Sequence, residues 1–216
     1  MSIYSCIEHG SAEEVRVYFQ ECTTAFDVVP PLPGSNLPVH LAIAFERLDL
    51  IEVLHGINAK WIDLVSAEGH TPLSLAACHD DLATVKLLIR LGCASHKRDT
   101  ISAVPVVNGA YPIEYAVRSG NNDIIRELVA WDPHQLELCS DYVTLTMGLV
   151  CMAAVHGRRS TIELLVELCG LDKFLSNGQN PIATATCYGR RHCLPLLFRL
   201  GFSVDRPKEK CNAIYY

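Results

Sequence analysis

The sequence predicts an all-α fold in which helical hairpins stack in a row. Five segments align on a pair of small residues in their first helix, and they start at Leu37, Thr71, Tyr111, Gly148 and Asn180. The starts lie 34, 40, 37 and 32 residues apart. Apolar residues recur in each segment at three- and four-residue spacings, as on one face of a helix. A repeat near 33 residues is typical of a solenoid whose units complete each other's core.

Two of the five segments open with a clear helix-start signal. Thr71 is a good N-cap, and Pro72 suits the first helical position, where its missing N–H is not needed. Asn180 and Pro181 repeat the same pattern. The segment at Gly148 has no such proline, so its helix start is the least defined by the sequence.

Glycines predict where the helices end. Gly120, Gly157 and Gly189 follow the first helices, where a left-handed residue is favoured. Gly92 and Gly201 end second helices in the same way. The first two segments have Glu46 and Asp80 at the turn position instead. A non-glycine residue in that conformation costs about 1 kcal/mol, less for Asp than for Glu.

These residues resemble those of the ankyrin-repeat family. The family's pattern of TPLH, paired alanines, paired aliphatic residues and a closing glycine is matched in three segments. The matches are Thr71-Pro72-Leu73, Ala76-Ala77, Val85, Leu87-Leu88 and Gly92; Pro112, Ala116, Gly120, Ile124-Ile125 and Leu128; and Pro181, Ala185, Gly189, Leu196-Leu197 and Gly201. The resemblance implies helix-turn-helix units with short hairpin fingers or loops between them.

The repeats predict a division of nearly the whole chain. Residues 1–34 are expected to form an N-terminal capping repeat and a proline-rich linker, with Gly10, Val15 and Phe19 in register with the family motif. Five repeats are expected at 35–67, 68–106, 107–140, 141–176 and 177–205. Residues 206–216 read as the start of a truncated sixth repeat, so we expect the chain to be a fragment of a longer protein.

Composition limits the class of protein. Half of the residues are apolar and 19% are charged, which excludes a disordered chain. Residues 1–140 carry a net charge of −9 and residues 141–216 a net charge of +3, so a general nucleic-acid binder is not expected. The sequence shows neither a signal peptide nor an apolar run long enough for a transmembrane segment. We expect a cytoplasmic protein whose ten cysteines are mostly buried thiols.

Catalytic and cofactor motifs are not recognisable in the sequence. It contains no phosphate loop, zinc-binding spacing, HExxH or GxSxG. Pairs such as Cys78-His79 are adjacent on a helix and point in different directions. We therefore expect no enzymatic activity of this segment and no cofactor or metal. A redox or metal sensor built from the cysteines remains an alternative that elemental analysis tests.

Residues one or two positions before the turn residue are candidates for partner binding. In ankyrin proteins the end of the first helix lines a concave groove, and the resemblance places Phe45, His79, Arg118, His156 and Tyr188 there. Aromatic residues and arginine are enriched where proteins bind each other. The alternative is that these side chains pack half-buried against neighbouring loops.

Paired arginines follow two of the turn glycines. Arg158-Arg159 and Arg190-Arg191 would lie close together if the repeats stack, with Arg199 and Arg206 nearby. Arginine binds carboxylates and phosphates with two parallel hydrogen bonds. The hypothesis is a basic patch for an acidic peptide, a phosphopeptide or a lipid head group; the alternative is an ordinary solvated turn.

Three further segments fall at repeat boundaries, at 58–63, 94–99 and 139–144. In ankyrin proteins such segments are tips of β-hairpin fingers, and there we expect Lys97, Arg98 and Tyr142 to be exposed. Trp61 is more typical of a core residue than of a binding residue.

The predicted function is protein–protein recognition through the groove and fingers, with a protein or peptide partner that is acidic near residues 158–191. The alternative is the substrate-targeting arm of a larger enzyme, or an effector injected by a bacterium into the host cytosol, with a catalytic domain beyond residue 216. The sequence does not define the oligomeric state.

Overall fold

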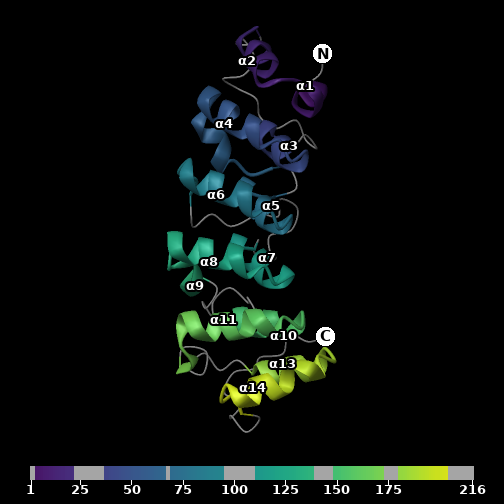
Figure 1. Cartoon of the computed structure of the whole chain (residues 1–216), viewed down its shortest axis with the longest axis vertical. Coiled ribbons are helices and arrows are strands. Elements are labelled where there is room, and N and C mark those ends of the chain that lie inside the picture. The colour runs from purple at the N-terminus through teal and green to yellow at the C-terminus, as the bar shows by residue number, and fades with distance from the viewer. Residues whose placement is uncertain are drawn as a thin grey trace. The chain divides into compact units, whose positions relative to one another are not determined.

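A computed structural model describes residues 3–21, 37–66, 69–94, 110–138, 148–172 and 180–203. The chain divides into two compact units, Met1–Pro112 and Ile113–Tyr216, which we describe separately (Figure 1). Every regular element in the described ranges is helical. The predicted all-α fold is therefore confirmed.

Unit 1 is a row of helical pairs (Figure 1). Its elements are α1 (Ile3–His9), α2 (Ala12–Glu21), α3 (Pro38–Ala44), α4 (Leu48–Ile57), the 3₁₀ helix η1 (Ala59–Asp63), α5 (Pro72–Cys78) and α6 (Leu82–Arg90). The first helix of the middle pair, α3, packs against α1 and α5, and its second helix, α4, packs against α2 and α6. Like therefore stacks on like, as the repeat predicted.

Unit 2 also consists of stacked helical pairs (Figure 1). Its elements are α7 (Pro112–Ser119, whose first residue belongs to unit 1), α8 (Asn122–Trp131), α9 (Gln135–Leu138), α10 (Leu149–Val155), α11 (Arg159–Cys169), α13 (Pro181–Cys187), the 3₁₀ helix η3 (Arg191–Cys193) and α14 (Leu194–Arg199). Helix α10 packs against its partner α11 and against α13 of the next pair, and α11 also contacts α8.

The predicted helix starts are confirmed by their capping hydrogen bonds. The Thr71 hydroxyl accepts from the Ser74 N–H at 3.1 Å, ahead of Pro72 in the first turn. The Asn180 side chain accepts from the N–H groups of residues 182 and 183, both at 3.1 Å. Helix α10 starts after Gly148, which offers no side-chain cap. This explains why the sequence defined that boundary least well.

The predicted left-handed turns are also confirmed. Gly120, Gly157 and Gly189 have φ of 85°, 70° and 68°. Glu46 and Asp80 occupy the same conformation, with φ of 56° and 59°. The first two repeats thus hold a non-glycine residue in a backbone region that disfavours a side chain.

The core of each unit lies between the stacked pairs. In unit 1, Ala76 and Ala77 are completely buried, which lets neighbouring first helices approach closely. The second helices contribute fully buried aliphatic side chains on one face. These are Leu50, Ile51, Leu54, Val85 and Leu88 in unit 1, and Ile124, Ile125, Leu128, Ile162, Leu165 and Leu197 in unit 2.

The segment at 58–63 differs from a hairpin finger. Residues 59–63 form the 3₁₀ helix η1, and the Asn58 side chain caps it by accepting from the Lys60 N–H at 3.1 Å. Trp61 is buried, as expected of a core residue, with its ring centroid 5.2 Å from that of Phe19 in α2. Burial of Trp61 and Ile62 ties this segment to the core. The predicted finger residues Lys97, Arg98 and Tyr142 lie outside the described residues.

The sequence also led to expectations about transmembrane segments and about the cysteines. Within the described ranges, no helix is long and apolar enough to cross a membrane. In the same ranges Cys6, Cys93, Cys151 and Cys193 are buried, Cys169 is half-buried, and Cys78 and Cys187 are exposed. The repeat boundaries given above remain a prediction.

Candidate partner-binding surface

The predicted groove residues lie at the ends of first helices. Phe45 and His79 are the C-cap residues of α3 and α5, which pack together in unit 1, while His156 and Tyr188 cap α10 and α13, which pack together in unit 2. Arg118 is the penultimate residue of α7. Phe45 is half-buried, whereas the other four side chains are exposed. Within each unit, the stacked helices therefore present these positions in a column.

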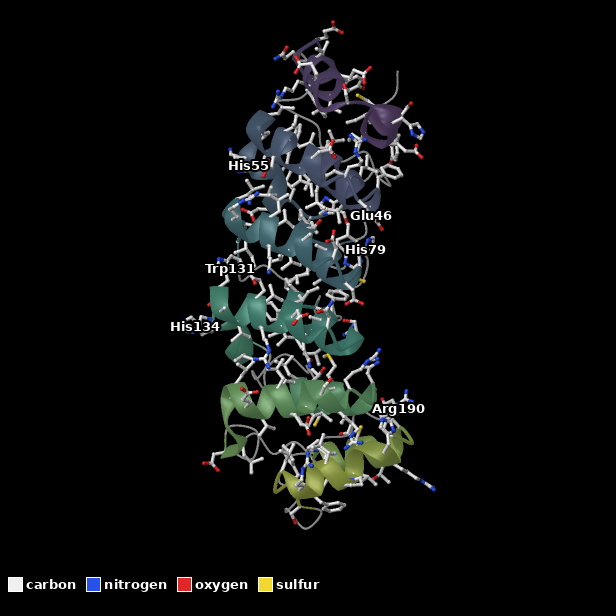
Figure 2. The ribbon with its side chains drawn as sticks, viewed as in Figure 1. Glu46, His55, His79, Trp131, His134 and Arg190 are labelled. Atoms are coloured by element: carbon white, nitrogen blue, oxygen red, sulfur yellow. The ribbon has the colours of Figure 1, made fainter. Side chains whose placement is uncertain are left out.

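Unit 1 has acidic residues at its turns. Figure 2 shows Glu46 and His79 on one side of unit 1, opposite His55 at the end of α4. Arg47, directly after Glu46, is held in place: its terminal nitrogens donate to the carbonyl oxygens of Ile7 at 3.2 Å and Gly10 at 2.9 Å. Its Nε also donates to Asp49 at 2.9 Å, and this hydrogen bond is the main reason that the pKa of the Asp49 carboxyl is lowered.

Unit 2 has arginines at the equivalent position. Arg158 follows Gly157, and its Nε donates to the carbonyl oxygen of Arg118 at 3.0 Å. Arg190 follows Gly189, and its Nε donates to the carbonyl oxygen of Val155 at 2.8 Å. Both carbonyls lie in the last turn of the preceding first helix, where unpaired oxygens and the negative end of the helix dipole attract cations. Each arginine thus caps the repeat before it.

The turn glycines leave the space that these side chains occupy. A Cβ on Gly120 would lie 2.8 Å from Cδ of Arg158, and one on Gly157 would lie 2.9 Å from Nε2 of His192. The His192 ring nitrogen is also 3.2 Å from the Gly157 carbonyl oxygen. Glycine is therefore required here both for its positive φ and for close approach.

Three arginines lie close enough to His156 to influence it. Although this side chain is exposed, its partial burial is the main cause that lowers the pKa of His156, and the positive charges of Arg118, Arg158 and Arg190 lower it further. Arg118 also lies over the Tyr115 ring, with its guanidinium carbon 5.5 Å from the centroid. We call Arg118, His156, Arg158 and Arg190 the cationic cluster of unit 2. Figure 2 shows Arg190 on the side of unit 2 opposite Trp131 and His134.

The predicted basic patch is distributed differently from the sequence hypothesis. Arg158 and Arg190 belong to the cationic cluster. Burial raises the pKa of the Cys193 thiol, and the charges of Arg159 and Arg190 both lower it by a smaller amount. Arg191 is exposed in η3. Arg199 pairs with Glu163 at 2.6 Å, and Arg206 lies outside the described residues.

In the sequence, Arg118 and the paired arginines were separate candidate features. They could have been linked by comparing the residue that follows each turn residue. In successive repeats this residue is Arg47, Asp81, Asn121, Arg158 and Arg190. Asp81 and Asn121 cap their own second helix by accepting from the N–H groups of Thr84 and Ile124. An arginine cannot accept, so α4 and α11 start without a side-chain cap, and the guanidinium turns to the preceding repeat.

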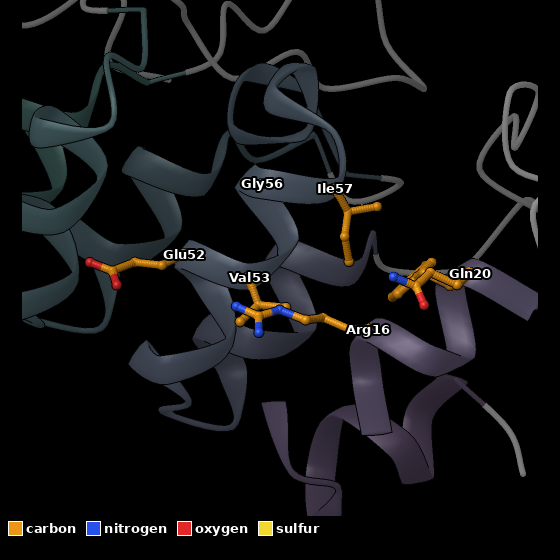
Figure 3. A pocket seen from close by; sticks show the side chains of 7 residues that line it. Arg16, Gln20, Glu52, Val53, Gly56 and Ile57 are labelled. Atoms are coloured by element: carbon orange, nitrogen blue, oxygen red, sulfur yellow. The ribbon is translucent and has the colours of Figure 1, made fainter. Parts of the chain in front are cut away.

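A shallow pocket in unit 1 is the second candidate site (Figure 3). It lies between α2 and α4 and has a volume of about 480 Å³. Phe19, Val53 and Ile57 supply its apolar wall, and Arg16 extends across from α2 beside Val53. Glu52 points away from Arg16 and pairs with Arg90 at 2.5 Å. The pocket is partly open and its exposed lining is mainly apolar, so it suits an apolar contact better than catalysis.

Comparison with known proteins agrees with this geometry. Residues 38–140 match the family model described as Ankyrin repeats (3 copies). The ankyrin repeat protein nuc-2 of Neurospora crassa is 27% identical over 190 residues, which cover 84% of this chain and 16% of that protein. This chain therefore spans about one sixth of the length of that relative.

A solved structure shows the same fold. The crystal structure of the human ASB11 ankyrin repeat domain superposes with a TM-score of 0.62 at 19% identity, covering 95% of this chain and 86% of that one. At this identity the likeness speaks for the fold alone. Together with the match of residues 38–140 to ankyrin repeats and the stacked helical pairs, it shows that the chain has the ankyrin-repeat fold.

Proposed function

We propose that the chain is a protein-binding module that contacts its partner through the exposed ends of the first helices. Ankyrin repeats generally mediate protein–protein interaction. The observation that carries the proposal is Tyr188, a large aromatic side chain that is 45% exposed at the end of α13, two residues before Arg190. Tyrosine and arginine are enriched among the residues that dominate binding energy.

The proposed contact surface has one part in each unit. In unit 1 it comprises Phe45 and His79, and in unit 2 Arg118, His156 and Tyr188. Each side chain is carried by a stacked helix, so a partner meets a preorganised surface and little ordering entropy is lost on binding. The predicted finger residues Lys97, Arg98 and Tyr142 are proposed as a second contact.

The surface favours an acidic partner in unit 2. The arginines of the cationic cluster and of the adjacent turns attract an acidic segment and orient it on approach. In unit 1, the turns carry Glu46, Asp80 and Asp81 instead. A partner that contacts both units would therefore carry complementary charges along its length.

Catalysis is not part of the proposal. Ankyrin repeat domains are typically non-catalytic binding modules. Within the described ranges, no group of three or more His, Cys, Asp or Glu side chains is placed to hold a metal ion.

A second candidate function is that of a targeting arm in a larger protein. The chain aligns with only 16% of its Neurospora relative, which favours a module that works beside other domains. Sequencing the full open reading frame tests this directly. A downstream catalytic motif supports a targeting arm, and further repeats or a stop codon support a binding scaffold.

The experiment for the main proposal is affinity capture with the full chain as bait, read by quantitative mass spectrometry. The test variant combines Phe45→Ser, His79→Ser, His156→Ser and Tyr188→Ser. A control variant carries Lys86→Ser, Arg126→Ser and Glu163→Ser, which lie on second helices outside the pocket. We expect partners to be lost with the test variant and retained with the control. Retention by both variants would contradict the proposed surface.

A further inference from the structure

We propose that the cationic cluster of unit 2 binds a phosphorylated side chain in an extended segment of the partner protein. This inference rests on the proposed function, because it names what the unit 2 part of the surface recognises. It starts from the four residues Arg118, His156, Arg158 and Arg190.

The cluster concentrates positive charge on a small surface. Three guanidinium groups lie close enough to His156 for each to influence it, and they come from the ends of three consecutive first helices and their turns. Within the described ranges, no carboxylate forms an ion pair with any of the three arginines. Elsewhere in unit 2, Arg126 and Arg199 each pair with a glutamate. Unlike Arg126 and Arg199, the arginines of the cluster therefore have no carboxylate partner among the described residues.

Two of the guanidinium groups are fixed before a ligand arrives. Arg158 and Arg190 use Nε to bind backbone carbonyl oxygens at 3.0 Å and 2.8 Å, so side-chain rotation is already restricted. A guanidinium has five N–H donors, and Nε supplies one of them. The terminal nitrogens keep the parallel donor geometry that matches phosphate oxygens. Binding therefore requires less ordering than at flexible surface arginines.

Both the charge and the number of acceptor oxygens favour a phosphate over a carboxylate. A phosphorylated side chain carries about −1.5 to −2 charges at neutral pH and three acceptor oxygens, whereas a carboxylate carries one charge and two oxygens. Three guanidinium groups near His156 offer more donors than a single carboxylate accepts. Recognition of phosphorylated residues by arginine clusters follows the same logic in other folds.

The surroundings favour a peptide over an anionic membrane. The chain has a net charge of −6, and its positive excess is confined to residues 141–216, which carry +3 against −9 in residues 1–140, so the chain as a whole is repelled by a broad anionic surface. A single phosphorylated residue engages only the cluster. The exposed Tyr188, two residues before Arg190, offers a contact for a neighbouring side chain of the same peptide.

The test uses the immobilised full chain and three synthetic peptide libraries with identical random flanks. The central residue is phosphoserine, serine or glutamate, and the bound fraction is measured at physiological salt. We expect the bound fraction of the phosphoserine library to exceed that of either other library by about tenfold. One charge-assisted hydrogen bond provides such a difference when its energy lies in the upper part of the usual range. Equal capture of the serine or glutamate library would overturn the proposal. Preference for phosphoinositide vesicles over phosphopeptides would overturn it as well.

Variants connect the capture to the cluster. Arg118→Met and His156→Gln are the test variants, because they leave in place the carbonyl hydrogen bonds of Arg158 and Arg190. Arg126→Met on α8 is the matched control, with the same change in net charge and the same exposed character. We expect Arg118→Met to lose phosphopeptide binding about tenfold and Arg126→Met to retain it. Equal binding by both variants would contradict the assignment.

Failure of this inference is distinguishable from failure of the proposed function. If phosphopeptides do not bind, but the quadruple Phe45, His79, His156 and Tyr188 variant still loses its partners, the surface is correct and the phosphate specificity is wrong. If phosphopeptides do not bind and the quadruple variant also retains its partners, the surface itself is wrong.

Discussion

The Nε of Arg190 donates a hydrogen bond to the carbonyl oxygen of Val155 at 2.8 Å, from one helical pair to the end of the preceding first helix. Arg158 makes the same type of contact with Arg118, and Arg47 with the end of α1. A residue after the left-handed turn thus links consecutive repeats wherever it is an arginine. The same side chains supply much of the positive charge of unit 2.

The first prediction concerns the structural part of this role. Arg190→Met removes the donor to the Val155 carbonyl and should lower the free energy of unfolding by about 1 kcal/mol. Arg191→Met removes an equal charge from the next residue, which is exposed, and should change stability by less than about 0.5 kcal/mol. Urea unfolding followed by circular dichroism compares the two. Equal losses would show that the carbonyl contact does not stabilise the stack.

The second prediction concerns the strained turn at Glu46. Glu46→Gly relieves a side chain held at φ 56° and should stabilise the chain by about 0.5 to 1 kcal/mol, read as a higher denaturant midpoint. Asp80→Gly should gain less, because Asp tolerates this conformation better.

The opposite substitution provides the control for the turns. Gly157→Ala places a Cβ 2.9 Å from the His192 ring at φ 70°, and it should destabilise the chain by at least about 1 kcal/mol. Stabilisation by Gly157→Ala, or destabilisation by Glu46→Gly, would contradict this account of the turns.

The third prediction concerns the pH dependence of His156. Its pKa in the folded chain lies below the ordinary value of 6.5, mainly through burial and then through Arg118, Arg158 and Arg190. The unfolded chain therefore binds a proton more readily, and stability falls as the pH drops from 6.5 through the folded pKa. His156→Gln should remove this part of the loss of stability at acidic pH. Unfolding midpoints measured across that pH range test this.

The same residue reports on its neighbours. Arg118→Met removes one of the positive charges and should raise the His156 pKa, although burial, the largest cause, still keeps it below 6.5. An NMR titration of the His156 ring proton measures this shift. An unchanged His156 pKa would place Arg118 outside the cluster.

The fourth prediction concerns thiol reactivity. Cys78 and Cys187 are exposed, whereas burial and the nearby Asp63 raise the pKa of the Cys93 thiol to about 12. Since the thiolate is the reactive form, iodoacetamide at mildly alkaline pH should label Cys78 and Cys187 first and Cys93 only on unfolding. Peptide mass spectrometry of timed samples measures the order. Early labelling of Cys93 in the folded protein would contradict its burial.

Local features were the most predictable from sequence. The caps at Thr71 and Asn180, the left-handed turns and the strained Glu46 depend on neighbouring residues, so the repeat pattern was enough to place them. The helix at 59–63 was not predicted, because it depends on Trp61 packing against Phe19, a residue distant in sequence.

The candidate site was predictable only in part. The alignment identified Arg118, His156, Arg158 and Arg190 as candidates. It did not show that Arg158 reaches back to Arg118, because that contact depends on side-chain direction between residues in successive repeats.

The most direct measurement of the central claim is site-specific photo-cross-linking in cell extract. A photoreactive phenylalanine analogue replaces Tyr188 at the end of α13 in one variant and Arg126 on α8 in another. The account predicts that a partner protein cross-links at position 188 and not at position 126. Cross-linking of the partner at position 126, with none at 188, would contradict it.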